Sequence, residues 1–112
     1  MKTTKVCDAQ RVDNPHGVDV RKLYDSEHAQ TMHITLKPGE SLKRHSTPVD
    51  VFFYVLEGEG VVEIGDEEQT VARDTIIESP AKIAHCWHNR SKEDFRVLVV
   101  KIPRPQNQTK VL

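Results

Sequence analysis

The stretch GESLKRHSTPVDVFFYVLEGEG, residues Gly39–Gly60, decides the fold of this chain. It opens on a turn, continues as a polar strand that carries His45, and breaks at Pro48. The segment Val51–Glu57 is rich in β-branched and aromatic side chains, as half-buried strands are. The glycines of GEG then mark a hairpin turn. The stretch therefore predicts paired strands that present a histidine beside an apolar wall.

The rest of the chain repeats this pattern of short strands broken by Gly, Pro and Asp. Residues Thr31–Lys37 alternate between apolar and polar side chains, which is typical of a strand with one buried face. Further strands are predicted at Val18–Tyr24, Val61–Gly65, Gln69–Ala72, Asp74–Ser79, Ile83–Asn89 and Phe95–Ile102. No long amphipathic helix is found, and the polar tail from Pro103 is expected to be a loose end or an arm. This spacing predicts an all-β antiparallel sandwich or barrel.

Length and charge narrow the classes of function. The 112 residues fit one domain, with a core at about residues 18–102. The net charge is -1 and both signs are mixed along the chain, so nucleic acid and anionic membranes are poor candidates for the main partner. The N-terminus has no apolar signal region, and no apolar run has the length of a membrane span, so a cytoplasmic location is expected. In that reducing compartment Cys7 and Cys86 are expected to be free thiols.

The histidines at 45 and 85 and their neighbours resemble the motifs of a known family. His45 follows Gly39 by a short strand, and His85 lies between Pro80 and Asn89. The spacing resembles the two motifs of the small single-domain cupins at Gly39, His45, Gly58, Pro80, His85 and Asn89. The resemblance covers nearly the whole chain. It implies the cupin antiparallel β-barrel, a double-stranded β-helix or jelly roll.

The same resemblance shows which metal ligands are missing. Cupins usually hold a divalent metal with three histidines and a carboxylate. The second histidine of the first motif is Thr47 here, and the carboxylate position is Val51. Only His45 and His85 remain, and two imidazoles alone hold Fe, Mn, Ni, Cu or Zn weakly. The sequence therefore predicts a weak metal site completed by water or substrate, or a site without metal.

Several neighbours are candidates for a further ligand. His33 is the leading one: hydrophobic alternation places it outside the barrel, whereas the cupin register turns it inward, and the alternative role is a hydrogen-bonded barrel histidine. A β-bulge at residues 48–50 would be needed to turn Asp50 inward. Cys86 and His88 are expected on the face opposite His85, Cys86 as a small buried thiol and His88 at the surface or an interface.

A ligand pocket is predicted around the two imidazoles. Strand alternation gives its lining as Thr47, Val51, Phe53 and Trp87, and simple core packing is an equal alternative for Phe53 and Trp87.

Three functions stay open, because a fold does not fix a function. The first is a small cupin that binds a divalent metal and acts on or senses a small oxygenated or carboxylated molecule. The second is a metal-free module in which His45 or His85 binds a ligand or acts as a base. The third is a structural module with a vestigial site. Whether the chain is an enzyme is left open. A homodimer is expected, with Val20–Tyr24 as an edge or swapped strand.

Overall fold

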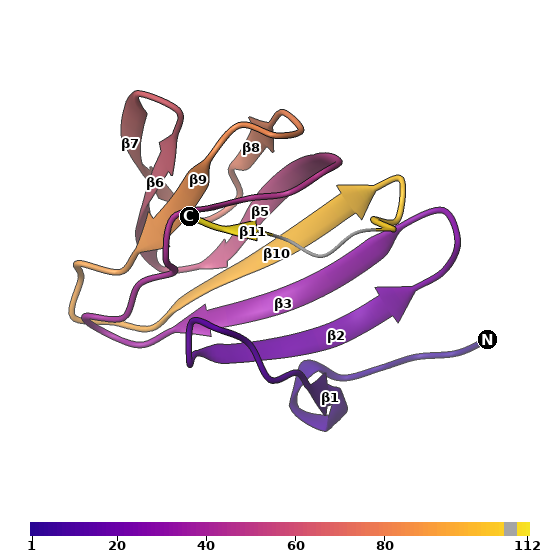
Figure 1. Ribbon diagram of the computed structural model, residues 1–112. Helices are drawn as coiled ribbons and strands as arrows, with labels where there is room; N and C mark the ends of the chain where they lie inside the picture. The colour runs from indigo at the N-terminus through magenta and orange to yellow at the C-terminus, as the bar shows by residue number, and fades with distance from the viewer. Residues whose placement is uncertain (107–109) are drawn as a thin grey trace.

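Two antiparallel sheets face each other and enclose the core (Figure 1). The computed structural model describes residues 1–106 and 110–112. Sheet A has, in spatial order, β1 (Gln10–Arg11), β2 (Asp19–Asp25), β3 (Gln30–Leu36), β10 (Phe95–Ile102), β5 (Asp50–Glu57) and β8 (Ile76–Ser79). Sheet B has β11 (Lys110–Val111), β4 (His45–Ser46), β9 (His85–His88), β6 (Glu59–Ile64) and β7 (Glu67–Ala72). The all-β antiparallel architecture predicted from the sequence is confirmed.

The core lies between the sheets and is built by strand alternation. On β5 the side chains of Val51, Phe53 and Val55 are buried, and their neighbours in sequence are less so. Trp87 of β9 packs against Phe53 and Phe95, with ring centroids 5.3 and 5.0 Å apart. The other buried members of this cluster are Val18, Val20, Ile34, Leu36, Leu42, Val62, Val71, Val97 and Val99.

The GEG turn of the opening stretch is a tight junction between β5 and β6. The predicted hairpin is wrong, because these strands lie in different sheets and do not pair. Gly58 has φ +81°, a conformation that favours glycine, and a Cβ there would press on the carbonyl oxygen of Asp94. Gly60 lies flat against the ring of Phe95, where a Cβ would stand 2.6 Å from ring carbons. Both glycines are therefore required by the close approach of β5–β6 to the start of β10.

The ends of the chain differ from the sequence expectations. Residues Lys110 and Val111 of the predicted loose tail form β11, which pairs with Ser46 and His45 of β4; residues 107–109 of that tail lie outside the described residues. The segment Val20–Tyr24 lies near the edge of sheet A: β2 pairs with β3 on one side, and on the other side β1 pairs with Arg21 and Lys22. Within residues 1–106 and 110–112 the helical structure is one 3₁₀ turn, η1 (Val6–Asp8), so no described helix could cross a membrane.

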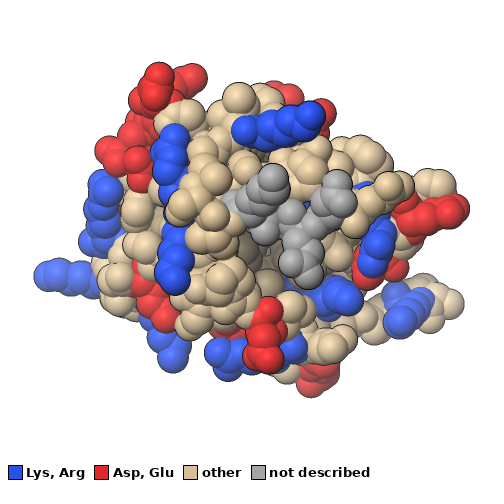
Figure 2. Space-filling model, viewed as in Figure 1, with Lys and Arg blue, Asp and Glu red and all other residues tan. Residues whose placement is uncertain are grey.

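Charges of both signs are scattered over the face shown in Figure 2, and the acidic ones gather over the β6–β7 hairpin. This hairpin carries the exposed Asp66, Glu67 and Glu68. The face has no continuous basic field of the kind that binds nucleic acid.

Candidate functional site

The histidines of the two motifs meet inside the barrel. His45 on β4 and His85 on β9 are partners across the sheet, and both side chains are buried. Their Nε2 atoms lie 3.0 Å apart, and their rings meet edge to face with centroids 4.4 Å apart. The structure thus brings the predicted pair together, and each ring contributes its Nε2 atom to the contact.

The far nitrogen of each ring is held by an oxygen. His45 Nδ1 lies 2.6 Å from the Lys43 carbonyl, which can only accept, so Nδ1 carries the proton of neutral His45 and Nε2 carries a lone pair. His85 Nε2 therefore donates to His45 Nε2, and His85 Nδ1 accepts from the Ser79 hydroxyl at 2.7 Å. These oxygen partners fix the orientation of both rings.

Both imidazoles are neutral at physiological pH. Burial lowers the pKa of His45, although the hydrogen bond to Lys43 opposes the change. Burial, with the nearby charges of His45 and Lys101, lowers the pKa of His85 to about 3. A neutral imidazole with an available lone pair is a metal ligand or a hydrogen-bond acceptor.

The pair lies in the wall of an open cavity of about 610 Å³. Apolar side chains line it, as in most small-molecule sites: Val12, Pro15, Val20, Met32, Ile34, Leu42, Phe53, Val99, Pro105 and Val111. Its polar and charged lining is Asp13, Asn14, His16, Gln30, His45, Thr47, His85, Lys101, Arg104 and Gln106. The cavity therefore suits a ligand with an apolar body and a few oxygen groups.

His16 is a functional candidate that sequence reasoning missed. Its ring lies 5.0 Å from that of His45, and burial, then the charges of His45 and Lys43, lower its pKa to about 4. The Asn14 side chain shapes the loop: its amide donates to the Val12 and Val18 carbonyls, and its oxygen accepts from His16 N. His16 Nδ1 accepts from Lys43 N, 27 positions away in sequence, so no local pattern signals this contact.

The four predicted pocket residues divide into two groups. Thr47 and Phe53 line the cavity beside the histidines. Val51 and Trp87 do not; they lie in the core, where Trp87 is fully buried beneath Phe53. The prediction is corrected for these two residues, because both are packed within the core cluster and neither lines the cavity.

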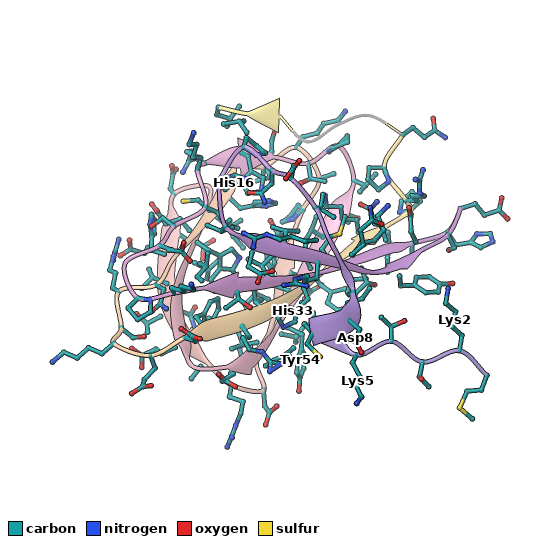
Figure 3. The ribbon with its side chains drawn as sticks, turned by 90° about the horizontal axis from the view of Figure 1, so that it is seen from below. Lys2, Lys5, Asp8, His16, His33 and Tyr54 are labelled. Carbon is teal, nitrogen blue, oxygen red and sulfur yellow. The ribbon has the colours of Figure 1, made fainter. Side chains whose placement is uncertain are left out.

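His33 does not join the pair, which corrects the leading candidate for a third ligand. Its neighbours Met32 and Ile34 line the cavity, so the pleat turns His33 to the outer face of sheet A. There Arg96 Nε donates to His33 Nε2 at 3.2 Å, and burial, then Arg96, lowers the His33 pKa. Figure 3 shows His33 near Tyr54 and apart from His16. The alternation of apolar residues predicts the direction of the His33 side chain correctly, and the register expected from cupins does not.

The remaining neighbours also lie outside the cavity. Asp50 is exposed, and its Oδ1 accepts from Ala81 N at 2.8 Å, so no bulge turns it inward. Cys86 and His88 occupy the face of β9 opposite His85, as predicted, and both cysteines are free. Among the described residues, the barrel thus offers a metal two imidazoles that meet, from His45 and His85. His16 lies beside them, but its Nδ1 lone pair already accepts from Lys43 N, and Asp13 is an acidic group of the cavity lining.

Comparison with known proteins gives a family and a fold. Residues 32–101 match the family model of the Cupin domain. The TT1209 protein of Thermus thermophilus has a similar structure, with a TM-score of 0.80 and 32% identity over 94% of this chain and 100% of that one. The polyketide cyclase RemF of Streptomyces resistomycificus has a TM-score of 0.85 at 21% identity, over 100% of this chain and 85% of that one.

A curated relative extends this comparison in sequence. The tetracenomycin polyketide synthase protein TcmJ of Streptomyces glaucescens is 37% identical over 79 residues, which are 66% of this chain and 52% of TcmJ. This chain therefore matches about half the length of that relative.

Proposed function

Because this chain belongs to the cupin domain family, we propose that it binds a divalent transition metal through His45 and His85 and a small oxygenated molecule beside it. The observation that supports this proposal is the meeting of two buried, neutral imidazoles, with Nε2 atoms 3.0 Å apart, in the wall of the cavity. Adjacent nitrogen ligands at about 2.1 Å from an octahedral metal are separated by about 3 Å, so the observed spacing fits octahedral coordination.

The donor set fits a weakly held metal. Both rings are neutral, and oxygen partners orient both, as around metal-bound histidines. For His85 to offer its Nε2 lone pair, its proton must lie on Nδ1, where the Ser79 hydroxyl can turn to accept it. His16 is the nearest further imidazole, and the hydroxyl of Thr47 is a poor ligand. A metal held there would supply Lewis-acid chemistry to a ligand carbonyl.

The cavity favours an anionic or enolisable ligand. Lys101 places a positive charge among the lining residues, and this charge contributes to the lowered pKa of both His45 and His85. An ionised carboxylate or enolate would be stabilised by the same charge. We take a polyketide-like molecule as the ligand class, because the names of TcmJ and RemF refer to polyketide synthesis and their resemblance covers the barrel.

A metal-free ligand site is the second candidate, and one observation favours it. The charge of Lys101 that disfavours a proton on His45 also disfavours a metal cation between the rings. In that case a ligand hydroxyl lies between the rings, accepts from His85 Nε2 and donates to the single lone pair of His45 Nε2, so it replaces the direct contact between the two rings. His85 then stays in the tautomer that accepts from Ser79.

Elemental analysis of untagged protein separates the two candidates. Loading with Fe, Mn, Ni, Cu or Zn should give a metal content that falls by up to one ion per chain in His45→Gln and in His85→Gln. His33→Gln is the matched control, since His33 is buried on the other side of sheet A. If the barrel takes up none of these metals, the metal proposal fails. Thermal shifts with hydroxylated aromatic ketones and small carboxylates then test the metal-free site, and shifts that survive in His45→Gln would count against it.

We also propose that the protein is a homodimer that buries the outer face of sheet A. Strand register aligns Leu98, Tyr54 and Ile76 across this face, and Val100 beside Phe52. Ile76 is 57% exposed in the single chain. An apolar row of this kind on an outer sheet face is typical of a surface covered by a partner.

A further inference from the structure

A second cluster of ligand-type side chains lies on the outer face of sheet B, away from the cavity. Glu63 of β6 and Cys86 of β9 are direct partners across the sheet, so their side chains share a face. His88, two residues beyond Cys86, lies on that same face, while His85 and Trp87 point to the barrel interior. The cluster is therefore separated from the His45–His85 pair by the thickness of one strand.

The three side chains converge on one point. Cys86 Sγ donates to Glu63 Oε2 at 3.0 Å, and His88 Nε2 lies 2.5 Å from the same oxygen. Cys86 Sγ and His88 Nε2 are 3.6 Å apart. Among the described residues, this is the group of three such side chains whose donor atoms all lie within 4.8 Å of one another. A sulfur, a nitrogen and an oxygen are thus in mutual contact, and a bound ion would replace the hydrogen bonds to Glu63 Oε2.

We propose that Glu63, Cys86 and His88 form a binding site for Zn²⁺ or a similar thiophilic divalent cation on the outside of the barrel. Thiolate, imidazole and carboxylate are the ligands that zinc uses in proteins. With Zn–S about 2.3 Å and Zn–N about 2.0 Å, tetrahedral geometry separates sulfur and nitrogen by about 3.5 Å. The Sγ–Nε2 distance of 3.6 Å already has this value.

The surroundings orient the ligands and leave them open to solvent, while they keep the thiol protonated until an ion binds. Ser41 Oγ lies 2.9 Å from His88 Nδ1, which orients the ring and leaves Nε2 at the cluster. Burial, then the neighbouring Glu63 carboxylate, raises the pKa of the Cys86 thiol to about 12, so a bound cation has to displace the thiol proton. The side chains of Glu63 and His88 are 31% and 24% exposed, so an ion can reach them from solvent. Binding would release the Cys86 thiol proton to solvent, and water would fill the fourth position.

A catalytic triad is a poorer interpretation of the same residues. In a cysteine–histidine–acid triad the thiol and the carboxylate contact different nitrogens of the imidazole. Here Glu63 and Cys86 both approach His88 Nε2, and Ser41 occupies Nδ1. Convergence on a single nitrogen fits ligands around an ion and does not fit a proton relay.

Cobalt is the probe that isolates this site, because a thiolate bound to Co²⁺ gives a near-ultraviolet charge-transfer band and the barrel histidines do not. Adding Co²⁺ to the reduced full-length protein should produce the band in proportion to one ion per chain. Adding Zn²⁺ should displace the bound Co²⁺ and remove the band. The double variant His45→Gln/His85→Gln should keep the band, so failure of the barrel proposal leaves this test intact.

Two cysteine variants decide the outcome. Cys86→Ser should abolish the band, whereas Cys7→Ser, which removes the exposed thiol, should leave it unchanged. Glu63→Gln and His88→Gln should each weaken Co²⁺ binding at least tenfold, and they keep Cys86 in place if Cys86→Ser folds poorly. The proposal is overturned if no band forms, if the band survives in Cys86→Ser, or if Glu63→Gln and His88→Gln bind as tightly as the natural chain.

Discussion

The hydroxyl of Ser79 lies 2.7 Å from Nδ1 of His85, on the side of the ring away from His45. Both residues are buried, so the hydroxyl is the partner that keeps this nitrogen from being unsatisfied. We expect Ser79→Ala to lower the free energy of unfolding by about 1–3 kcal/mol, measured by urea denaturation. Thr70→Ala, at an exposed position of β7, is the control and should change it by less than about 0.5 kcal/mol. Equal effects in the two variants would contradict this role of Ser79.

Stability should fall as the pH drops below neutrality. The pKa of His85 is about 3 in the folded chain and near 6.5 when exposed, so between these values the unfolded chain binds more protons. The contribution of His85 to the free energy of unfolding is fully present above about pH 6.5. Below that pH it decreases by about 1.4 kcal/mol per pH unit. Urea denaturation at several pH values should give a shallower pH dependence in His85→Gln. His28→Gln, at an exposed histidine, should keep the slope of the natural chain; an unchanged slope in His85→Gln would refute the assignment.

The two motif glycines with positive φ should respond differently to alanine. Gly39 has φ +86° and open space where a Cβ would lie, so Gly39→Ala should cost about 1–2 kcal/mol of backbone strain. Gly58→Ala adds the clash with the Asp94 carbonyl and should cost about 1–3 kcal/mol more. Thermal or urea denaturation of the two variants measures the difference. Equal losses in the free energy of unfolding would contradict this prediction. They would mean that the β5–β6 junction shifts to accommodate the new methyl group.

The proposed dimer predicts a mass change from one substitution. Leu98→Lys places a charge in the apolar row of sheet A and should convert the dimer to a monomer, as measured by light scattering. Thr70→Lys on β7 is the control and should keep the dimer mass. A monomer mass for the natural chain would reject the proposal.

The strands could be predicted because their signals are local. The Gly58 turn and the alternation in Val51–Glu57 are both short-range features, and β5 and β10 lie close to their expected bounds. β11 could not be predicted in this way, because the polar tail has no strand pattern and its order comes from pairing with β4. The short β4 has the same origin, because its two residues form a strand through pairing with β9 and β11.

The site was predictable only in part. His45 and His85 follow from motif spacing, but His16 reaches the cavity through a loop whose position depends on long-range contacts. The sequence left the direction of His33 open between the family register and the alternation of Met32 and Ile34, and the alternation is correct. Burial of apolar side chains outweighs the placement of one histidine, since each apolar residue gains about 1.5–3 kcal/mol from burial. The outer cluster at Glu63 needed the β6–β9 register, which no local pattern supplies.

The alternation of β9 has a consequence for how this protein can change. Its four residues place His85 and Trp87 on the interior and Cys86 and His88 on the exterior. A slip of one residue in its pairing would exchange these two sets, and the thiol would then enter the barrel while His85 faced solvent. Insertions and deletions in this strand would thus remove both centres at once, whereas point substitutions can alter either centre alone.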